Sequence, residues 1–221
     1  MSGELKYLSN ARLIDGTGGS VPEKPCAMVV SERRISTVAS QSQLPCPEGA
    51  VQFDLQGMTL MPGLVDCHDH LAVLEGGMVA RAAVPPTLAV FKTAQTFHDT
   101  LLGGFTSIRD AGGVDLGMKL AVEQGLIPGP RLKISVNILS QFGGHNDHTE
   151  LAGIDSDFPR LPGVPDSICD GVDGCRRKVR EMIRAGADWI KICTTGGVGT
   201  PTGGPLIRQF SLEEVRAMVD T

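Results

Sequence analysis

Two histidines separated by one residue, His68 and His70, stand at the end of the apolar segment that begins at Met61. If this segment is a β-strand, its two-residue period turns both imidazoles to the same side. Neutral imidazoles are common metal ligands, and two of them at a strand end make half of a catalytic site with room for water. We therefore predict that His68 and His70 bind one metal ion, although a single His-x-His motif is weak support.

A lysine lies in a second apolar segment, Asp188–Cys193, which has strand character and contains Lys191. A buried ammonium is unfavourable unless it is paired, neutralised or chemically altered. One interpretation is that the stem of Lys191 lies along apolar surface while its head reaches water. The other is that its neutral amine takes up carbon dioxide, and the resulting carbamate offers two oxygen ligands to a pair of bridged metal ions. The presence of His68 and His70 favours the second interpretation.

The sequence gives weaker support for a functional role of the other three histidines. His98 falls in the predicted helix Thr87–Leu102, and we expect a structural role for it. His145 and His148 follow a predicted strand, where loops form part of the substrate pocket in barrel enzymes. His145 is predicted either to orient a substrate carboxylate or carbonyl, or to be a solvated surface group. Arg109 and Asp110 are expected to make local structural bonds and are kept outside the site.

The secondary structure predicted around these residues changes after residue 60. Short β-branched or apolar segments separated by turn residues precede this point and predict a small β-domain over residues 1–60. The predicted strands are Leu5–Leu8, Arg12–Ile14, Ala27–Val30, Ile35–Val38 and Val51–Leu55. Strands then alternate with helices over residues 61–221, and four such β/α units predict a parallel α/β domain, open or barrel-shaped.

Residues 61–221 contain both predicted strands and predicted helices. The predicted strands are Leu64–Cys67, Phe105–Arg109, Arg131–Val136 and Asp188–Cys193, and the predicted helices are Thr87–Leu102, Leu116–Gln124 and Gly174–Ala185. Ser211 and Glu214 have the spacing of a capping box, which predicts a helix start. Because four units cannot close an eight-stranded barrel, we expect the sequence to be the front part of a longer fold.

Composition limits the class of partner. The 221 residues carry a formal net charge of −5 with interspersed charges, which argues against a nucleic-acid interface or a membrane patch and favours a small-molecule partner. No segment approaches the length of a membrane span, and we expect a cytoplasmic protein. The six cysteines lack Cys-x-x-Cys spacing, so reduced thiols are expected, with Cys67 and Cys193 buried in their strands.

The chain resembles the metal-dependent amidohydrolase superfamily, in particular its imidazolonepropionase-like and Xaa-Pro dipeptidase-like branch. The segments that carry the resemblance agree in order and spacing along the whole chain, and they are Asn10–Gly16, Gly57–His70, Gly103–Asp110 and Ala187–Ile192. The branch often shows Gly-Gly-His-Gly-Asp after the third strand, where this sequence has Asn146 in place of the inner glycine.

The resemblance implies the N-terminal part of a (β/α)8 TIM-type barrel preceded by a small β-sandwich domain. It implies that His68 and His70 bind the more buried of two divalent metal ions, most plausibly zinc, and that carbamylated Lys191 bridges the pair. The family's further ligands, a histidine on each of strands five and six and a proton-shuttling aspartate on strand eight, would lie beyond Thr221.

The predicted function is therefore hydrolysis of a carbon–nitrogen bond in a small amide, dipeptide-like or cyclic. Two alternatives stay open: an inactive truncated fragment, and a non-catalytic metal-binding or assembly module. A homo-oligomer is also compatible with the sequence, and the substrate itself is not predicted.

Overall fold

The computed structural model describes residues 5–20, 22, 24–73, 83–149, 152–155, 161–198, 200 and 204–221. The chain divides into two compact units, residues 1–63 and 64–221, which we describe separately. The predicted domains, 1–60 and 61–221, stay a prediction, because compactness does not measure independent folding.

The first unit is built around a five-stranded sheet with the order β3-β2-β1-β4 and with β5 also paired to β1. Its elements are β1 (Lys6–Leu13), β2 (Cys26–Ser31), β3 (Arg34–Ser40), the 3-10 helix η1 (Gln41–Gln43), β4 (Val51–Asp54) and β5 (Thr59–Leu60). Alternation along β2 sends Ala27 and Val29 to one apolar cluster and Cys26 and Met28 to the other. Both faces of this sheet therefore carry apolar side chains.

One strand replaces two predicted strands in this unit. The predictions Leu5–Leu8 and Arg12–Ile14 are wrong as separate strands, because β1 runs through both with a register shift between Leu8 and Ala11. Asn10 lies in the shift with φ 54°, a conformation that Asn tolerates better than most residues. Its backbone N–H donates to the Gln41 side chain at 2.7 Å, which compensates for the interrupted ladder.

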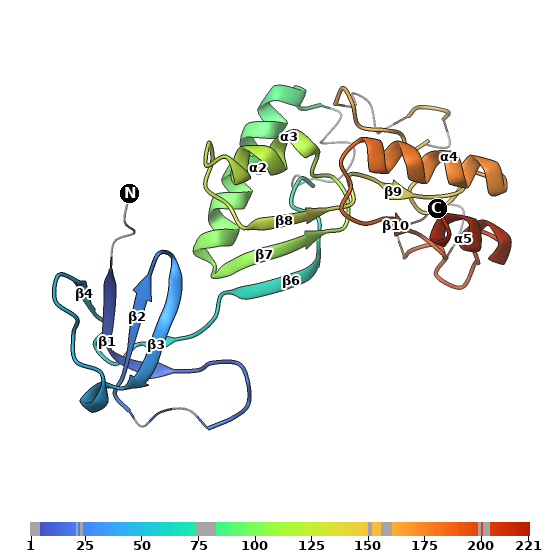
Figure 1. Ribbon diagram of the computed structural model, residues 1–221. Helices are drawn as coiled ribbons and strands as arrows, with labels where there is room; N and C mark the ends of the chain where they lie inside the picture. Colours follow the sequence, from blue (N-terminus) through green and yellow to red (C-terminus); the bar gives the residue numbers. More distant parts are fainter. Residues whose placement is uncertain are drawn as a thin grey trace. The chain divides into compact units, whose positions relative to one another are not determined.

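The second unit alternates parallel strands with helices, which confirms the α/β class. Strands β6 (Leu64–Asp69), β7 (Phe105–Asp110) and β8 (Arg131–Ile134) form one parallel sheet, and β9 (Ile138–Leu139) pairs in parallel with β10 (Lys191–Ile192). Helices α2 (Pro86–Leu102) and α3 (Leu116–Glu123) lie on one side of the first of these sheets (Figure 1). Over the described residues both sheets are open, so closure into a barrel stays a prediction.

Helix α4 (Gly171–Arg184) precedes β10 and packs against α5 (Leu212–Val219). The predicted capping box is confirmed, because the Ser211 side chain accepts from the Glu214 backbone and the Glu214 side chain accepts from the Ser211 backbone. The side chains that fill the core of this unit are fully buried, among them Phe97, Ile108, Ile134, Leu139 and Met182.

The third predicted strand, Arg131–Val136, is interrupted rather than continuous. Strand β8 ends at Ile134, and Val136 has φ 67°, a conformation that a β-branched residue rarely adopts. The chain then enters β9, which the sequence did not predict because its regular part has only two residues. The strand predicted over Asp188–Cys193 is likewise regular only at Lys191 and Ile192.

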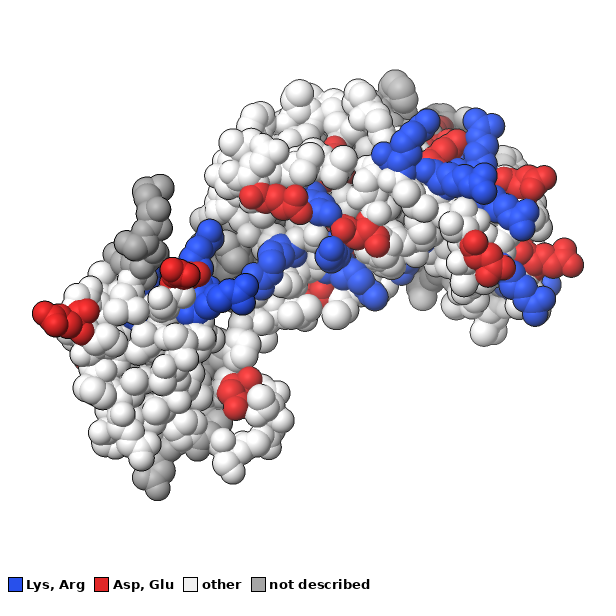
Figure 2. Space-filling model, viewed as in Figure 1, with Lys and Arg blue, Asp and Glu red and all other residues white. Residues whose placement is uncertain are grey.

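Charged side chains of both signs are interspersed on the face shown in Figure 2, and the densest blue group covers α4. Within that helix Arg177 pairs with Glu181 at 3.0 Å. Among the described helices, none is both long enough and apolar enough to cross a bilayer.

Candidate metal centre

The end of β6 brings the two predicted ligands together. The ring centroids of His68 and His70 are 5.5 Å apart with an interplanar angle of 62°, so both rings lie on the same side of the strand. Each histidine backbone N–H is bound by a carboxylate, that of His68 by Asp66 at 2.8 Å and that of His70 by Asp69 at 2.7 Å. These local bonds fix the backbone from which the imidazoles project.

A backbone carbonyl orients the His70 ring. The Nδ1 atom of His70 lies 3.0 Å from the Gly112 oxygen, so Nδ1 carries the proton and Nε2 keeps its lone pair. A carbonyl partner on one ring nitrogen is the usual way to orient a metal-binding histidine. Only glycine fits at position 112, because φ is 135° and an added Cβ would lie 2.6 Å from Ile138 Cγ1.

Lys191 meets His68 although the two residues are far apart in the sequence. Lys191 Nζ lies 3.3 Å from His68 Nε2, within reach of a hydrogen bond in which the ammonium donates to the neutral imidazole. The positive charge of Lys191 lowers the pKa of His68, and partial burial, His70 and Arg109 add to this effect. His68 is therefore held in the neutral form that a metal ligand requires.

A buried aspartate organises the loop beside these ligands, and sequence reasoning left it outside the site. Asp110, at the end of β7, accepts backbone N–H bonds from Leu71, Gly112 and Val114 at 3.1, 3.0 and 3.3 Å. Burial raises the pKa of Asp110, and these three bonds act in the opposite direction. Its position at a strand end before two glycines is the sequence signal that could have indicated this role.

His145 lies on an exposed loop in which another side chain holds its ring. His145 Nδ1 is 2.8 Å from Thr200 Oγ1, and the same oxygen accepts from the Gly197 backbone at 2.8 Å. Among the described residues no hydrogen bond joins His145 to His68, His70 or Lys191. Its proposed contact with substrate therefore rests on its place in the loop.

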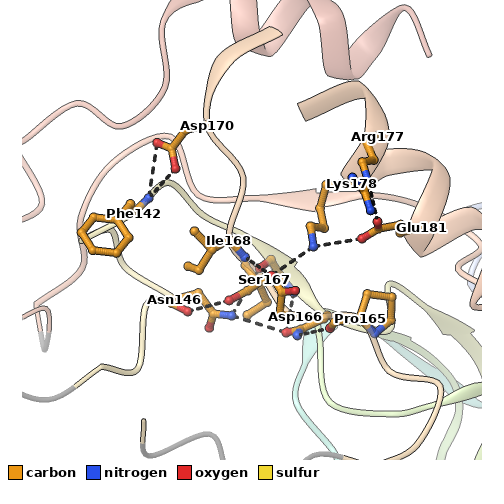
Figure 3. A network of polar contacts seen from close by, with 12 residues as sticks. Phe142, Asn146, Pro165, Asp166, Ser167, Ile168, Asp170, Arg177, Lys178 and Glu181 are labelled. Atoms are coloured by element: carbon orange, nitrogen blue, oxygen red, sulfur yellow. Dashed lines mark hydrogen bonds and ion pairs between the residues drawn. The ribbon is translucent and has the colours of Figure 1, made fainter. Parts of the chain in front are cut away.

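Asn146, which replaces the glycine of the family pattern, anchors this loop from within. It is 8 % exposed, and its Nδ2 lies 3.2 Å from the Ile138 carbonyl and 3.4 Å from Asn137 Oδ1. Its own carbonyl accepts from Ser167 Oγ at 2.8 Å (Figure 3). The substitution thus adds an anchor between the His145 loop and β9.

The same network continues to a buried lysine on α4. Lys178 pairs with Asp166 at 3.0 Å and with Glu181 at 2.9 Å, as Figure 3 shows. Burial alone would lower the pKa of Lys178, but the two carboxylates outweigh it and raise that pKa. Lys178 is therefore a structural cation that ties α4 to the segment around Ser167.

The remaining predicted residues have structural positions. His98 lies exposed on α2 with Nδ1 3.1 Å from Asp99 Oδ1, and His148 Nε2 lies 3.1 Å from Asn146 Oδ1. No disulfide joins any of the six cysteines, which all lie in the described residues, and Cys193 is buried as expected. The expectation for Cys67 is wrong, because its strand β6 is an edge of the described sheet and leaves the residue exposed.

His68, His70 and Lys191 supply a partial donor set for a metal ion. Two imidazole nitrogens fit a divalent transition metal, whereas an ammonium repels one unless it becomes neutral or is carbamylated. Among the described residues no group of three or more His, Cys, Asp and Glu side chains could hold a metal. These residues therefore fit part of a centre that needs further ligands.

Comparison with known proteins agrees with the predicted resemblance. The amidohydrolase family profile matches residues 59–221. The chain is 33 % identical to ochratoxinase from Aspergillus niger over 221 aligned residues, which cover 94 % of this chain and 46 % of that protein. The chain thus spans about half the length of the curated relatives that it matches along most of its sequence.

Solved structures give the same result. A prolidase in complex with N-methylphosphonate-L-proline superposes with a TM-score of 0.85 at 35 % identity, over 98 % of this chain and 53 % of the other. A Xaa-Pro dipeptidase with methionine bound in its active site gives a TM-score of 0.84 at 27 % identity, with 98 % and 53 % covered. The predicted Xaa-Pro dipeptidase-like resemblance is confirmed.

Proposed function

The chain belongs to the amidohydrolase family, and on that premise we propose that it contributes metal ligands to a hydrolase of carbon–nitrogen bonds in small amides or dipeptides. The observation that carries the proposal is the 3.3 Å approach of Lys191 to His68, across 123 residues of sequence. A lysine amine beside the imidazole pair can become the carbamate that such a centre needs. The prolidase and ochratoxinase likenesses support the substrate class.

In this proposal His68 and His70 would hold one metal ion, and Lys191, once carbamylated, would be a ligand shared with a second. Two zinc ions would polarise the substrate carbonyl and lower the pKa of water. The Gly112 carbonyl keeps the His70 proton on Nδ1. His145, steadied by Thr200, directs its other ring nitrogen to a carbonyl or carboxylate of the substrate.

The fold that we propose around this centre is a (β/α)8 barrel, in which β6, β7, β8 with β9, and β10 are the first four strands. Their parallel pairing and the helices between them support this arrangement. For the first unit we propose a β-sandwich, because one face of its sheet holds an apolar cavity of about 410 Å³ lined by side chains such as Leu13, Met28 and Leu60.

The test begins with the zinc content of the purified chain, measured by elemental mass spectrometry after gel filtration in ¹³C-bicarbonate buffer. We expect bound zinc together with a carbamate carbon signal near Lys191, and we expect Lys191→Ala to remove both. A short carboxylic acid should partly restore zinc binding to that variant. Lys92→Ala is the matched control, because Lys92 is exposed on α2 of the same unit.

The outcomes separate the alternatives. Equal zinc content in Lys191→Ala and Lys92→Ala would contradict the bridging role of Lys191. Two zinc ions per chain would show that a second copy or other residues complete the centre, and hydrolysis of Xaa-Pro dipeptides should then be assayed. Zinc binding without hydrolysis by any preparation that carries the complete ligand set would favour a non-catalytic module.

A further inference from the structure

One side chain of β7 contacts both segments that carry the proposed ligands. Arg109 Nε donates to the Cys67 carbonyl of β6 at 2.7 Å. The guanidinium carbon of the same arginine lies 4.6 Å from the centroid of the Trp189 ring, a cation–π distance. Cys67 precedes His68, and Trp189 lies two residues before Lys191.

The Cys67 carbonyl needs this partner because the β6–β7 ladder is irregular there. Asp66 is opposite Ile108 and Asp69 is opposite Asp110, so β6 has one residue more than β7 between these pairs. Such a bulge leaves backbone groups unpaired and changes the direction of a side chain, and it is common beside active sites. Cys67 and His68 lie within it, and Arg109 supplies a donor to the carbonyl.

No backbone pairing connects the two ligand-bearing strands within the described residues. Strand β6 belongs to the sheet β6-β7-β8, whereas β10 pairs with β9 in another. The Asp188 backbone N–H donates to the Ile134 carbonyl at 2.7 Å and ties the start of the Lys191 segment to β8. Side chains can support the contact with His68 nearer to Lys191 itself. Arg109 is suited to this task, since its planar guanidinium can stack on an indole while its Nε donates to a carbonyl.

We propose that Arg109 is a positioning residue, which clamps the Cys67–His68 bulge against Trp189 and so fixes the alignment of His68 with Lys191. The consequence for metal binding rests on the proposed function, whereas the alignment itself does not. Lysine at position 109 would keep the charge but could not stack and donate in the same geometry.

The chain offers a direct probe of this clamp, because Trp189 is its single tryptophan. In Arg109→Met and Arg109→Lys we expect a changed emission maximum of Trp189 and greater quenching by acrylamide. Arg131→Met is the matched control, since Arg131 lies on neighbouring β8 and donates to Ser107 rather than to Cys67. Circular dichroism would verify that each variant folds.

A second measurement, made without metal, tests the alignment. The imidazole ¹H–¹⁵N spectrum reports whether His68 Nε2 accepts a hydrogen bond, and His98 serves as the internal reference. We expect the His68 signal to move in Arg109→Met and also in Trp189→Leu, which removes the other face of the clamp. Unchanged His68 signals in both folded variants would overturn the proposal, as would Arg131→Met having the same effect.

Zinc affinity then links the clamp to the proposed function. Loss of a residue that orients metal ligands typically weakens metal binding about 10- to 100-fold, and we expect this for Arg109→Met with less than about a twofold change for Arg131→Met. If the unmodified chain binds no zinc, the proposed function fails while the His68 spectrum still decides on the clamp. A shifted His68 signal with unchanged zinc affinity would support the alignment by Arg109 and overturn its consequence for metal binding.

Discussion

Lys119 Nζ lies 2.9 Å from both carboxylate oxygens of Asp188, which joins α3 to the segment that enters β10. Asp188 also accepts from Lys133 at 3.1 Å and from the Ile134 backbone at 2.9 Å. Three separate groups thus fix the residue three positions before Lys191. The segment that carries the proposed ligand Lys191 is therefore held by contacts with α3 and with β8.

Asp188→Ala should lower the free energy of unfolding by about 2 kcal/mol, because hydrogen bonds to charged groups contribute about 1.5–3 kcal/mol and several are lost together. The side chains of Asp188 and Lys119 are only 16 % and 13 % exposed, so water does not fully replace the lost contacts. Urea denaturation measures the change. Lys133→Met is the control, and its exposed side chain should account for no more than about 1 kcal/mol.

Glu214 provides a test with pH. Its carboxylate accepts from the Ser211 backbone at 2.6 Å and from the Gly171 backbone at 2.7 Å. The Ser211 bond is the largest cause of a lowered pKa of Glu214, and the Gly171 bond adds to it. A lowered folded-state pKa gives stability that is present above the unfolded value of about 4.3 and is lost as pH falls through the folded value.

Glu214→Gln should therefore reduce the free energy of unfolding by about 1 kcal/mol at pH 7, since one amide oxygen cannot fully replace two carboxylate oxygens. The difference from the unmodified chain should shrink as pH falls toward about 3. Glu213→Gln is the matched control, because Glu213 lies in the same first turn but is exposed. A difference that stays constant from pH 7 to pH 3 would contradict this linkage.

Local chemistry accounts for what could be predicted from the sequence. The capping box of Ser211 and Glu214 and the helix before Leu102 follow from side chains close in sequence, and both are present. The two-strand prediction over β1 failed because Asn10 takes a positive φ that a distant side chain, Gln41, supports.

The least predictable relationships join residues on different strands. The apolar segment around Lys191 does not indicate that the lysine meets His68, and the shared centre of the two residues was implied by the family resemblance. The Arg109–Trp189 stack depends on a bulge in β6 and on the approach of a strand from a different sheet. The local structural bonds expected of Arg109 and Asp110 are present at Asp110, with Gly112 and Val114, whereas Arg109 donates to the distant Cys67.

Gly197→Ala should displace the His145 ring, since the added Cβ would overlap His145 Cε1. We expect the imidazole signals of His145 to lose the signature of the Thr200 hydrogen bond, with His98 unchanged. Gly204→Ala is the matched control in the same region, because its Cβ would meet nothing within 4 Å. If His145 contacts substrate as proposed, Gly197→Ala should also raise KM more than it lowers kcat in the complete enzyme.

Asn146→Gly restores the residue of the family pattern, and it tests whether Asn146 is an anchor. The variant loses three side-chain hydrogen bonds, to Ile138, Asn137 and His148, and leaves the space of a buried amide. We expect the free energy of unfolding to fall by about 1–2 kcal/mol.

Amide hydrogen exchange should accelerate around His145, because the loop loses its attachment to β9. Phe142, in the same loop, has an exposed side chain, and Phe142→Ala is the matched control. Exchange that stays as slow in Asn146→Gly as in this control would show that Ser140 and Ser167, which bind the backbone of residue 146, hold the loop by themselves.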